Sequence, residues 1–251
     1  MQADGWKADF FGGDVPEDCF ELVHGLGFSH PRKAKLDIHA SAFHSHYRDA
    51  LNGDLWNTAI GFSFNTFHSE TFSAEYQLIN ACSHGFAWNV VPPIRWVADA
   101  VKIIGTAPLD WDLLAESAIT HDLHGDIVWN LDYLRKVWNQ PVPGRIVDRL
   151  RKAPVSRQKR ALLRVVSRRM ATPMDGVRKL WALHDYYCSS VGRTRLLYRL
   201  AHFPKYIMAV RGLRDTRSLL SWGWEKFSER TRYWYRRRRA ATSSTDRAGV
   251  R

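Results

Sequence analysis

The chain has 251 residues, with 37 Lys and Arg against 25 Asp and Glu, so its net charge is +12 and its pI is near 9.9. This length allows one or two domains with a buried core, and an apolar fraction of 45% with a mean hydropathy of −0.36 is typical of a soluble globular protein. The sequence has no run of about 18 apolar residues, which argues against a transmembrane helix, and its N-terminus has no secretory signal pattern.

The three cysteines are far apart, at Cys19, Cys82 and Cys188, and none belongs to a Cys-x-x-Cys pair. This spacing favours reduced thiols in a cytoplasmic protein over a disulfide scaffold or a zinc ribbon. Most of the Lys and Arg follow Arg135, so we expect a basic C-terminal part that attracts nucleic acid, nucleotides or an anionic membrane surface.

A small antiparallel sheet is predicted near the N-terminus. Residues 19–24 and 35–42 have strand-like patterns, and Pro31-Arg32-Lys33 lies between them as a loop. In the second strand Asp37 and His39 share one polar face, because alternate side chains of a strand point the same way. A half-exposed sheet face that only meets water is the alternative for this pair.

Histidines surround this predicted hairpin and suggest a metal site, but no Cys or carboxylate lies at a spacing that would complete four zinc ligands. We therefore favour surface histidines for this group, which comprises His24, His39, His44 and His46. Further along, four phenylalanines predict a strand or loop that packs aromatic rings into the core, at Phe62, Phe64, Phe67 and Phe72.

Two amphipathic helices are predicted next. The first begins at Ala74 and ends near Gly85, which can adopt the left-handed C-cap conformation. Pro92-Pro93 opens the second, in which Arg95 and Asp99 are spaced to form an i,i+4 ion pair. Asp110 or Asp112 then caps a third helix.

The predicted fold class is α+β and mostly α: a small antiparallel sheet, a helical bundle, and a basic helical C-terminal extension. The predicted domains are a sheet over 1–73, a helical bundle over 74–155, a basic helical extension over 156–239 and a disordered tail over 240–251.

Four motifs together resemble an uncharacterised bacterial family of nucleotidyltransferases, which belongs to the polymerase-β-like superfamily. They occur in order along residues 5–150, as Leu36-Asp37-Ile38-His39, Cys82-Ser83-His84-Gly85, Ile94-Arg95-Trp96-Val97-Ala98-Asp99-Ala100 and Leu109-Asp110-Trp111-Asp112. The resemblance identifies the sheet as a remnant of a nucleotidyltransferase core. It implies Mg²⁺-dependent transfer of a nucleoside monophosphate from an NTP to an unknown acceptor.

The resemblance also assigns roles to individual residues. Asp37 would be a catalytic, metal-binding carboxylate, and Arg95, His84 and His39 would bind substrate. The remaining motif residues are structural, namely Trp96, Asp99, Asp110, Trp111 and Asp112. A helix cap, an ion pair and a core indole are the simpler explanation for most of these positions, and Arg95 has the best claim to substrate contact.

The chain departs from the family pattern before Asp37. No Gly-Ser turn followed by Asp-x-Asp precedes it, and Pro16 after Gly12-Gly13-Asp14 does not suit a strand that carries two carboxylates. Two Mg²⁺ ions need several oxygen ligands, so we expect this chain to lack the first two carboxylates and to be incomplete or inactive alone.

A non-catalytic function is the alternative. Residues 231–239 interleave Arg with Trp and Tyr. Arginines neutralise phosphates and aromatic rings stack on bases, so this segment predicts nonspecific binding of nucleic acid or of another anionic surface.

Overall fold

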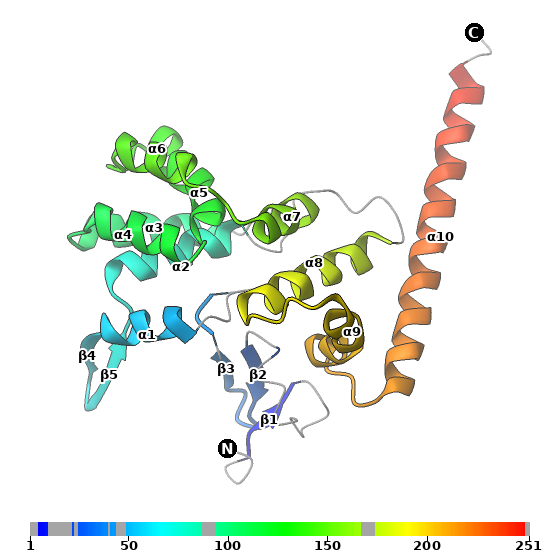
Figure 1. The fold of residues 1–251 in the computed structure, drawn as a ribbon, viewed down its shortest axis with the longest axis horizontal. Helices are drawn as coiled ribbons and strands as arrows, with labels where there is room; N and C mark the ends of the chain where they lie inside the picture. The colour runs from blue at the N-terminus through cyan, green and yellow to red at the C-terminus, as the bar shows by residue number, and fades with distance from the viewer. Residues whose placement is uncertain are drawn as a thin grey trace. The chain divides into compact units, whose positions relative to one another are not determined.

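The computed structural model describes residues 5–9, 22, 25–39, 41–43, 49–86, 94–166 and 174–248 (Figure 1). Most of these residues are helical, and the strands form two small antiparallel sheets. The predicted α+β, mostly α fold class is therefore confirmed. Among the described helices, none is both long enough and apolar enough to cross a bilayer.

The chain divides into two compact units, which we call the terminal unit (residues 1–40 and 162–251) and the central unit (residues 41–161). The terminal unit joins the N-terminal sheet to the C-terminal helices. The domains predicted from the sequence are continuous stretches of the chain, at 1–73, 74–155, 156–239 and 240–251, whereas the terminal unit combines both ends of the chain. A sequence pattern does not show which distant segments pack together. Here the apolar face of the N-terminal sheet packs against a helix from the C-terminal part of the chain.

The terminal unit contains a three-stranded sheet in the order β1-β2-β3 and three long helices. Its strands are β1 (Lys7–Ala8), β2 (Gly25–Ser29) and β3 (Lys35–His39), and its helices are α8 (Asp175–Ser190), α9 (Leu196–Arg211) and α10 (Thr216–Ala248). Helix α7 (Arg157–Val166) crosses the boundary between the two units.

The hairpin of β2 and β3 confirms the loop predicted at residues 31–33 and the strand predicted from Lys35. The partner strand is Gly25–Ser29, however, and of the predicted strand 19–24 only Leu22 is described. One face of the sheet is apolar: Ala8, Leu26 and Phe28 are buried and pack with Ala209 and Val210 of α9. Burial of this face ties the N-terminal sheet to a C-terminal helix.

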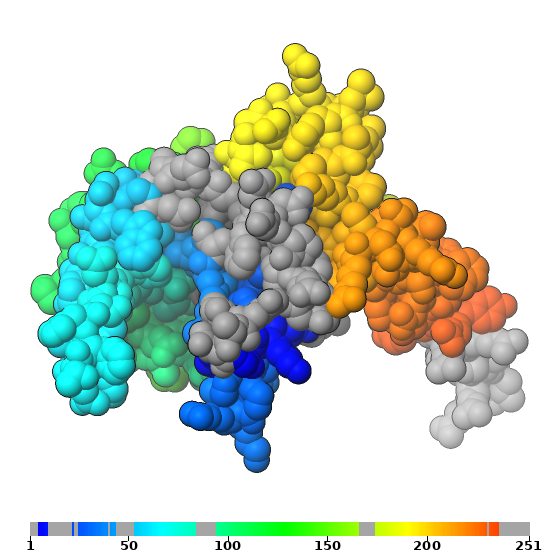
Figure 2. Space-filling model, turned by 90° about the horizontal axis from the view of Figure 1, so that it is seen from below, coloured from blue at the N-terminus to red at the C-terminus, as the bar shows by residue number. Residues whose placement is uncertain are grey.

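Helix α10 continues to Ala248, whereas the sequence analysis placed a disordered tail from residue 240. Residues 240–248 contain neither Gly nor Pro, the two residues that disfavour a helix most strongly. The helix also packs against α9, where the Arg211 guanidinium lies 5.4 Å from the centre of the Trp222 ring. Figure 2 shows the surface of the first part of α10 in orange.

The central unit is a helical bundle with an attached β-hairpin. Its elements are α1 (Asp49–Asn57), β4 (Ile60–Phe64), β5 (Phe67–Thr71), α2 (Ala74–Phe86), α3 (Arg95–Thr106), α4 (Trp111–Thr120), α5 (His124–Val137) and α6 (Gly144–Lys152). Helix α2 contacts α3, α4 and α5, so it is the centre of the bundle.

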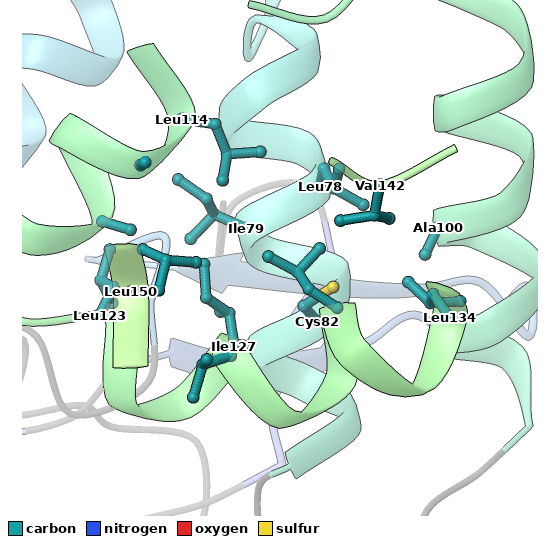
Figure 3. Packing of buried hydrophobic residues seen from close by; sticks show 14 of the residues in the cluster. Leu78, Ile79, Cys82, Ala100, Leu114, Leu123, Ile127, Leu134, Val142 and Leu150 are labelled. Atoms are coloured by element: carbon teal, nitrogen blue, oxygen red, sulfur yellow. The ribbon is translucent and has the colours of Figure 1, made fainter. Parts of the chain in front are cut away.

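The core of the bundle forms around the apolar face of α2 (Figure 3). Leu78, Ile79 and Cys82 are fully buried there, beside Leu114 of α4 and Ile127 of α5. Each buried leucine or isoleucine contributes about 1.5–3 kcal/mol relative to an exposed one. Burial also raises the pKa of the Cys82 thiol, which keeps this cysteine protonated and unreactive.

The aromatic segment at residues 60–72 differs from its prediction. It forms the β4–β5 hairpin, and Phe62, Phe64 and Phe67 are 47–75% exposed. Only Phe72, which follows β5, packs against the core of the bundle. A two-stranded hairpin has no second layer of its own, so its aromatic side chains stay outside the core unless another element covers them.

Asp132 joins α5 to α6 through ionic hydrogen bonds. Its carboxylate is 8% exposed, and it accepts hydrogen bonds from Lys136 at 2.8 Å, from Arg135 at 3.0 Å and from Arg151 of α6. The hydrogen bond from Lys136, followed by those from the two arginines, lowers the pKa of Asp132 far below its usual range. The charged form of this carboxyl is therefore the one that stabilises the bundle.

Replacing Asp132 with Asn should lower the free energy of unfolding at pH 7 by an amount on the order of 2 kcal/mol, because charge-assisted hydrogen bonds are lost. The pKa of Asp132 is lower in the folded state, so this contribution is present above the unfolded pKa of about 3.9 and is lost as the pH falls below it. Chemical denaturation of the wild type and the variant at pH 7 and at pH 3 measures both effects.

Asp148→Asn is the matched control, since that carboxylate is 66% exposed and lies 4.0 Å from Arg151. The stabilising role of the Asp132 carboxylate would be contradicted if both variants lost the same free energy of unfolding. It would also be contradicted if the loss in Asp132→Asn were as large at pH 3 as at pH 7.

Candidate functional site

The polar face of the three-stranded sheet carries two neighbouring carboxylates. Asp37 lies on β3, where its Cα pairs with that of Gly27 on β2. Asp9 follows β1, and its backbone N–H donates to the Gly27 carbonyl at 2.9 Å. A Cβ on Gly27 would lie 2.7 Å from Oδ2 of Asp9 and 3.1 Å from Oδ1 of Asp37. The absence of a side chain at Gly27 therefore creates the space into which both carboxylates reach.

One oxygen of Asp9 is held in place by Ser29, whose hydroxyl donates to Oδ1 at 2.6 Å. This bond leaves Oδ2 as the oxygen that approaches Gly27. His39 lies two residues after Asp37 on the same strand, and its ring is close to Gly25 on β2. The shared polar face predicted for Asp37 and His39 is thus present, and both residues are exposed.

Two carboxylates that approach the same position above Gly27 suit a hard divalent cation. Mg²⁺ is commonly bound through one or two carboxylates together with water and substrate phosphates. Asp9 and Asp37 are thus the candidate ligands for one divalent cation. A two-metal centre needs further carboxylates beyond this pair.

The family-like residues of α3 lie in the central unit. Trp96 is buried, and its ring centre lies 6.0 Å from that of Tyr133, so it acts as a core indole. Arg95 and Asp99 are both exposed, and within the described ranges no ion pair joins them. The i,i+4 ion pair expected here is therefore not found.

Asp110 is the N-cap of α4, one of the two positions predicted for this cap. Its Oδ1 accepts hydrogen bonds from the backbone N–H groups of Asp112 at 3.0 Å and Leu113 at 2.9 Å. Its own N–H donates to the buried Glu75 carboxylate of α2 at 3.0 Å. Asp110 thereby fixes the start of α4 against the central helix of the bundle.

Asp112 and Trp111 have local structural contacts too. Arg145 of α6 donates two hydrogen bonds to Asp112, at 2.7 and 2.9 Å, which lower the pKa of that carboxyl. Trp111 is partly buried against the bundle core. His84 lies within α2, which continues through Gly85 to Phe86 instead of ending at a glycine cap. The His84 side chain and Pro92-Pro93 lie outside the described residues.

A second cluster of ligand-type side chains lies between α8 and α9. His184 and Cys188 are one turn apart on α8, and His202 comes from α9. His184 Nε2 lies 3.2 Å from His202 Nδ1 and 3.3 Å from Cys188 Sγ. The three ligand atoms all lie within 4.8 Å of one another, and His184 and Cys188 are fully buried.

Burial sets the protonation of this cluster. It lowers the pKa of His184 to about 4, with smaller contributions from His202 and Arg199, so the imidazole is neutral near pH 7. Burial also raises the pKa of the Cys188 thiol to about 11. Nδ1 of His184 is buried and has no hydrogen-bond partner among the described residues.

The sequence analysis missed Asp9 and the α8–α9 cluster. Asp9 stands at the end of a two-residue strand, which is too short to give a periodic signal. The spacing of His184 and Cys188, four residues apart on a predicted helix, was a usable signal, since i and i+4 side chains share a helix face. The third residue, His202, could be placed beside them only by the packing of α9 on α8.

Comparison of the chain with protein-family models, with curated proteins and with solved structures finds no match. The likeness to nucleotidyltransferases therefore depends on the four sequence motifs. The substrate-binding roles of Arg95, His84 and His39 stay predictions.

Truncating Asp110 to Ala should lower the free energy of unfolding by about 1 kcal/mol, because two backbone N–H groups of α4 lose their cap. Asp112→Ala should cost less, since Asp112 and Arg145 are both exposed and solvent screens their attraction. Urea denaturation of both variants tests this order. A larger loss in Asp112→Ala would contradict the capping role assigned to Asp110.

Proposed function

We propose that this chain serves Mg²⁺-dependent nucleotidyl transfer by binding a metal–nucleotide complex on the polar face of its N-terminal sheet. Asp37, the carboxylate singled out by the family resemblance, and Asp9 would hold one Mg²⁺ ion. The observation that carries this proposal is the approach of both carboxylates to the open space above Gly27.

The chemistry of the ion suits this role. A Mg²⁺ ion offsets the mutual repulsion of the two carboxylates, and it can bridge them to the phosphate oxygens of an NTP. When bound, it would neutralise charge on the triphosphate as the pyrophosphate leaves. Ser29 holds Asp9 by a hydrogen bond, and the β2–β3 pairing positions Asp37, so both ligands are placed by the strands themselves.

This proposal also limits what the chain does alone. One pair of carboxylates holds one ion, and a two-metal reaction needs more ligands. These would come from residues outside the described ones or from another chain. We therefore expect the purified chain to bind Mg²⁺–NTP without transferring nucleotide by itself, and the acceptor is unknown.

Binding of Mn²⁺, which substitutes for Mg²⁺ and is detected by electron paramagnetic resonance, tests the site in the presence of ATP. Asp37→Asn and Asp9→Asn should each weaken Mn²⁺ binding at least about tenfold, equivalent to about 1.4 kcal/mol. Gly27→Ala should weaken it as well, since the new methyl group would displace the Asp9 carboxylate.

Glu70→Gln is the control, because this exposed carboxylate lies on the β4–β5 hairpin of the other unit. Mn²⁺ binding that is unchanged in Asp37→Asn and Asp9→Asn would refute the site. Transfer of labelled nucleotide by the purified chain alone would refute the expectation that it binds Mg²⁺–NTP without catalysing transfer.

A second candidate function is binding of single-stranded nucleic acid by α10. Trp224, Phe227, Tyr233 and Tyr235 are 50–73% exposed on this helix, among arginines such as Arg217 and Arg232. Exposed aromatic rings can stack on bases while arginines neutralise phosphates. These exposed rings favour nucleic acid over a purely electrostatic attraction to anions.

Replacing Arg236–Arg239 with Gln should weaken binding of a labelled single-stranded oligonucleotide and flatten its salt dependence, by up to about 3 in the slope of log K against log salt. Replacing the same four residues with Lys should retain the slope of log K against log salt. Trp224→Ala should weaken binding and leave this slope unchanged. Fluorescence anisotropy at several salt concentrations measures these effects. A slope unchanged by the Gln variant, or binding to anionic lipid vesicles only, would rule this function out.

A further inference from the structure

We propose that His184, Cys188 and His202 form a zinc site that joins α8 to α9. The site would hold Zn²⁺ by two imidazole nitrogens and one thiolate, with its fourth coordination position open to water or to another ligand. It is separate from the carboxylate site of the sheet in both its residues and its ligand chemistry.

The distances fit this ion. Zinc bonds of about 2.0–2.1 Å to nitrogen and about 2.3 Å to sulfur, in a tetrahedral array, place ligand atoms roughly 3.3–3.6 Å apart. The two contacts of His184 Nε2, at 3.2 and 3.3 Å, are shorter than these edges by only about 0.1–0.3 Å. The third pair of atoms lies within 4.8 Å, so a small movement of one side chain completes the array.

Hydrogen bonding alone does not explain the same contacts. A neutral imidazole nitrogen has either one lone pair or one proton, yet His184 Nε2 lies within bonding distance of both Cys188 Sγ and His202 Nδ1. One of these two contacts therefore lacks a good hydrogen bond. Around a metal ion, all three atoms would instead act as electron-pair donors to the same centre.

The surrounding structure holds the ligands in place without the ion. Arg199 of α9 forms an ion pair with Asp185 of α8, and its guanidinium also donates to Ser189 Oγ at 3.3 Å. This clamp fixes α9 beside the helical turn that carries His184 and Cys188. Ligands whose positions are fixed by other contacts lose little entropy when a metal binds.

Aromatic rings enclose the cluster. The rings of Tyr187 and Tyr198 are stacked on that of His202, with centres 6.2 and 5.2 Å away, and the ring of Tyr206 lies 5.1 Å from that of His184. These rings shield part of the cluster from water, which strengthens the bonds of a thiolate to a cation. A soft sulfur ligand with two imidazoles favours zinc over Mg²⁺ or Ca²⁺, which prefer oxygen.

Cobalt(II) provides a spectroscopic test, since it occupies zinc sites and gives a sulfur-to-metal charge-transfer band in the near ultraviolet when a thiolate binds it. The full chain, stripped of metal with a chelator, should bind one equivalent of Co²⁺ with this band and with the visible bands of tetrahedral cobalt. Added Zn²⁺ should displace the cobalt and remove both sets of bands.

The variants assign the ligands. Cys188→Ser should abolish the charge-transfer band, and His202→Gln should weaken Co²⁺ binding at least about tenfold. The double variant Cys19→Ser, Cys82→Ser leaves Cys188 as the one cysteine of the sequence and should retain the full spectrum. Asp9→Asn and Asp37→Asn should leave the spectrum unchanged, which separates this site from the carboxylate site.

Absence of the charge-transfer band in the wild-type chain would overturn the proposal, and so would its persistence in Cys188→Ser. Circular dichroism shows whether each variant is folded. If Cys188→Ser does not fold, the Co²⁺ titrations of the wild type and of His202→Gln test the proposal. Co²⁺ binding that is unchanged in His202→Gln would exclude the proposed ligand set.

Discussion

The three-stranded sheet can bury only one of its faces, and α9 provides the surface that covers it. Leu26 and Phe28 pack on Ala209 and Val210, so the polar face with Asp9 and Asp37 is left open. The same helix carries His202 toward α8. One helix therefore supports both candidate sites of the terminal unit, and a change in its packing would disturb the sheet and the histidine–cysteine cluster together.

The two sites differ in the ions that they can select. The sheet offers carboxylate oxygens on an exposed face, which suit a hydrated, hard cation that shares its ligands with phosphate. The cluster between α8 and α9 offers two nitrogens and a sulfur within a buried aromatic shell, which suits zinc. Ligand chemistry and burial thus favour different ions at the two proposed sites of the terminal unit.

In the central unit, most of the family-like residues have structural contacts. Asp110 caps α4 and binds to Glu75, Asp112 pairs with Arg145, and Trp96 packs in the core. Arg95 is exposed, and its contact with a substrate stays a prediction. Ordinary helix capping, ion pairing and core packing can therefore account for most of the residues on which the resemblance to the family depends.

The sequence by itself determined the features that depend on neighbouring residues. These are the mostly helical fold class, the loop before Lys35, a helix cap at Asp110 or Asp112, and the common face of Asp37 and His39, because strand and helix periodicity act over a few residues. Tertiary structure alone decided which distant segments meet: Asp9 with Asp37 across Gly27, and His202 with His184 and Cys188. Such pairs depend on how apolar faces pack across the whole chain, and no local pattern encodes that choice.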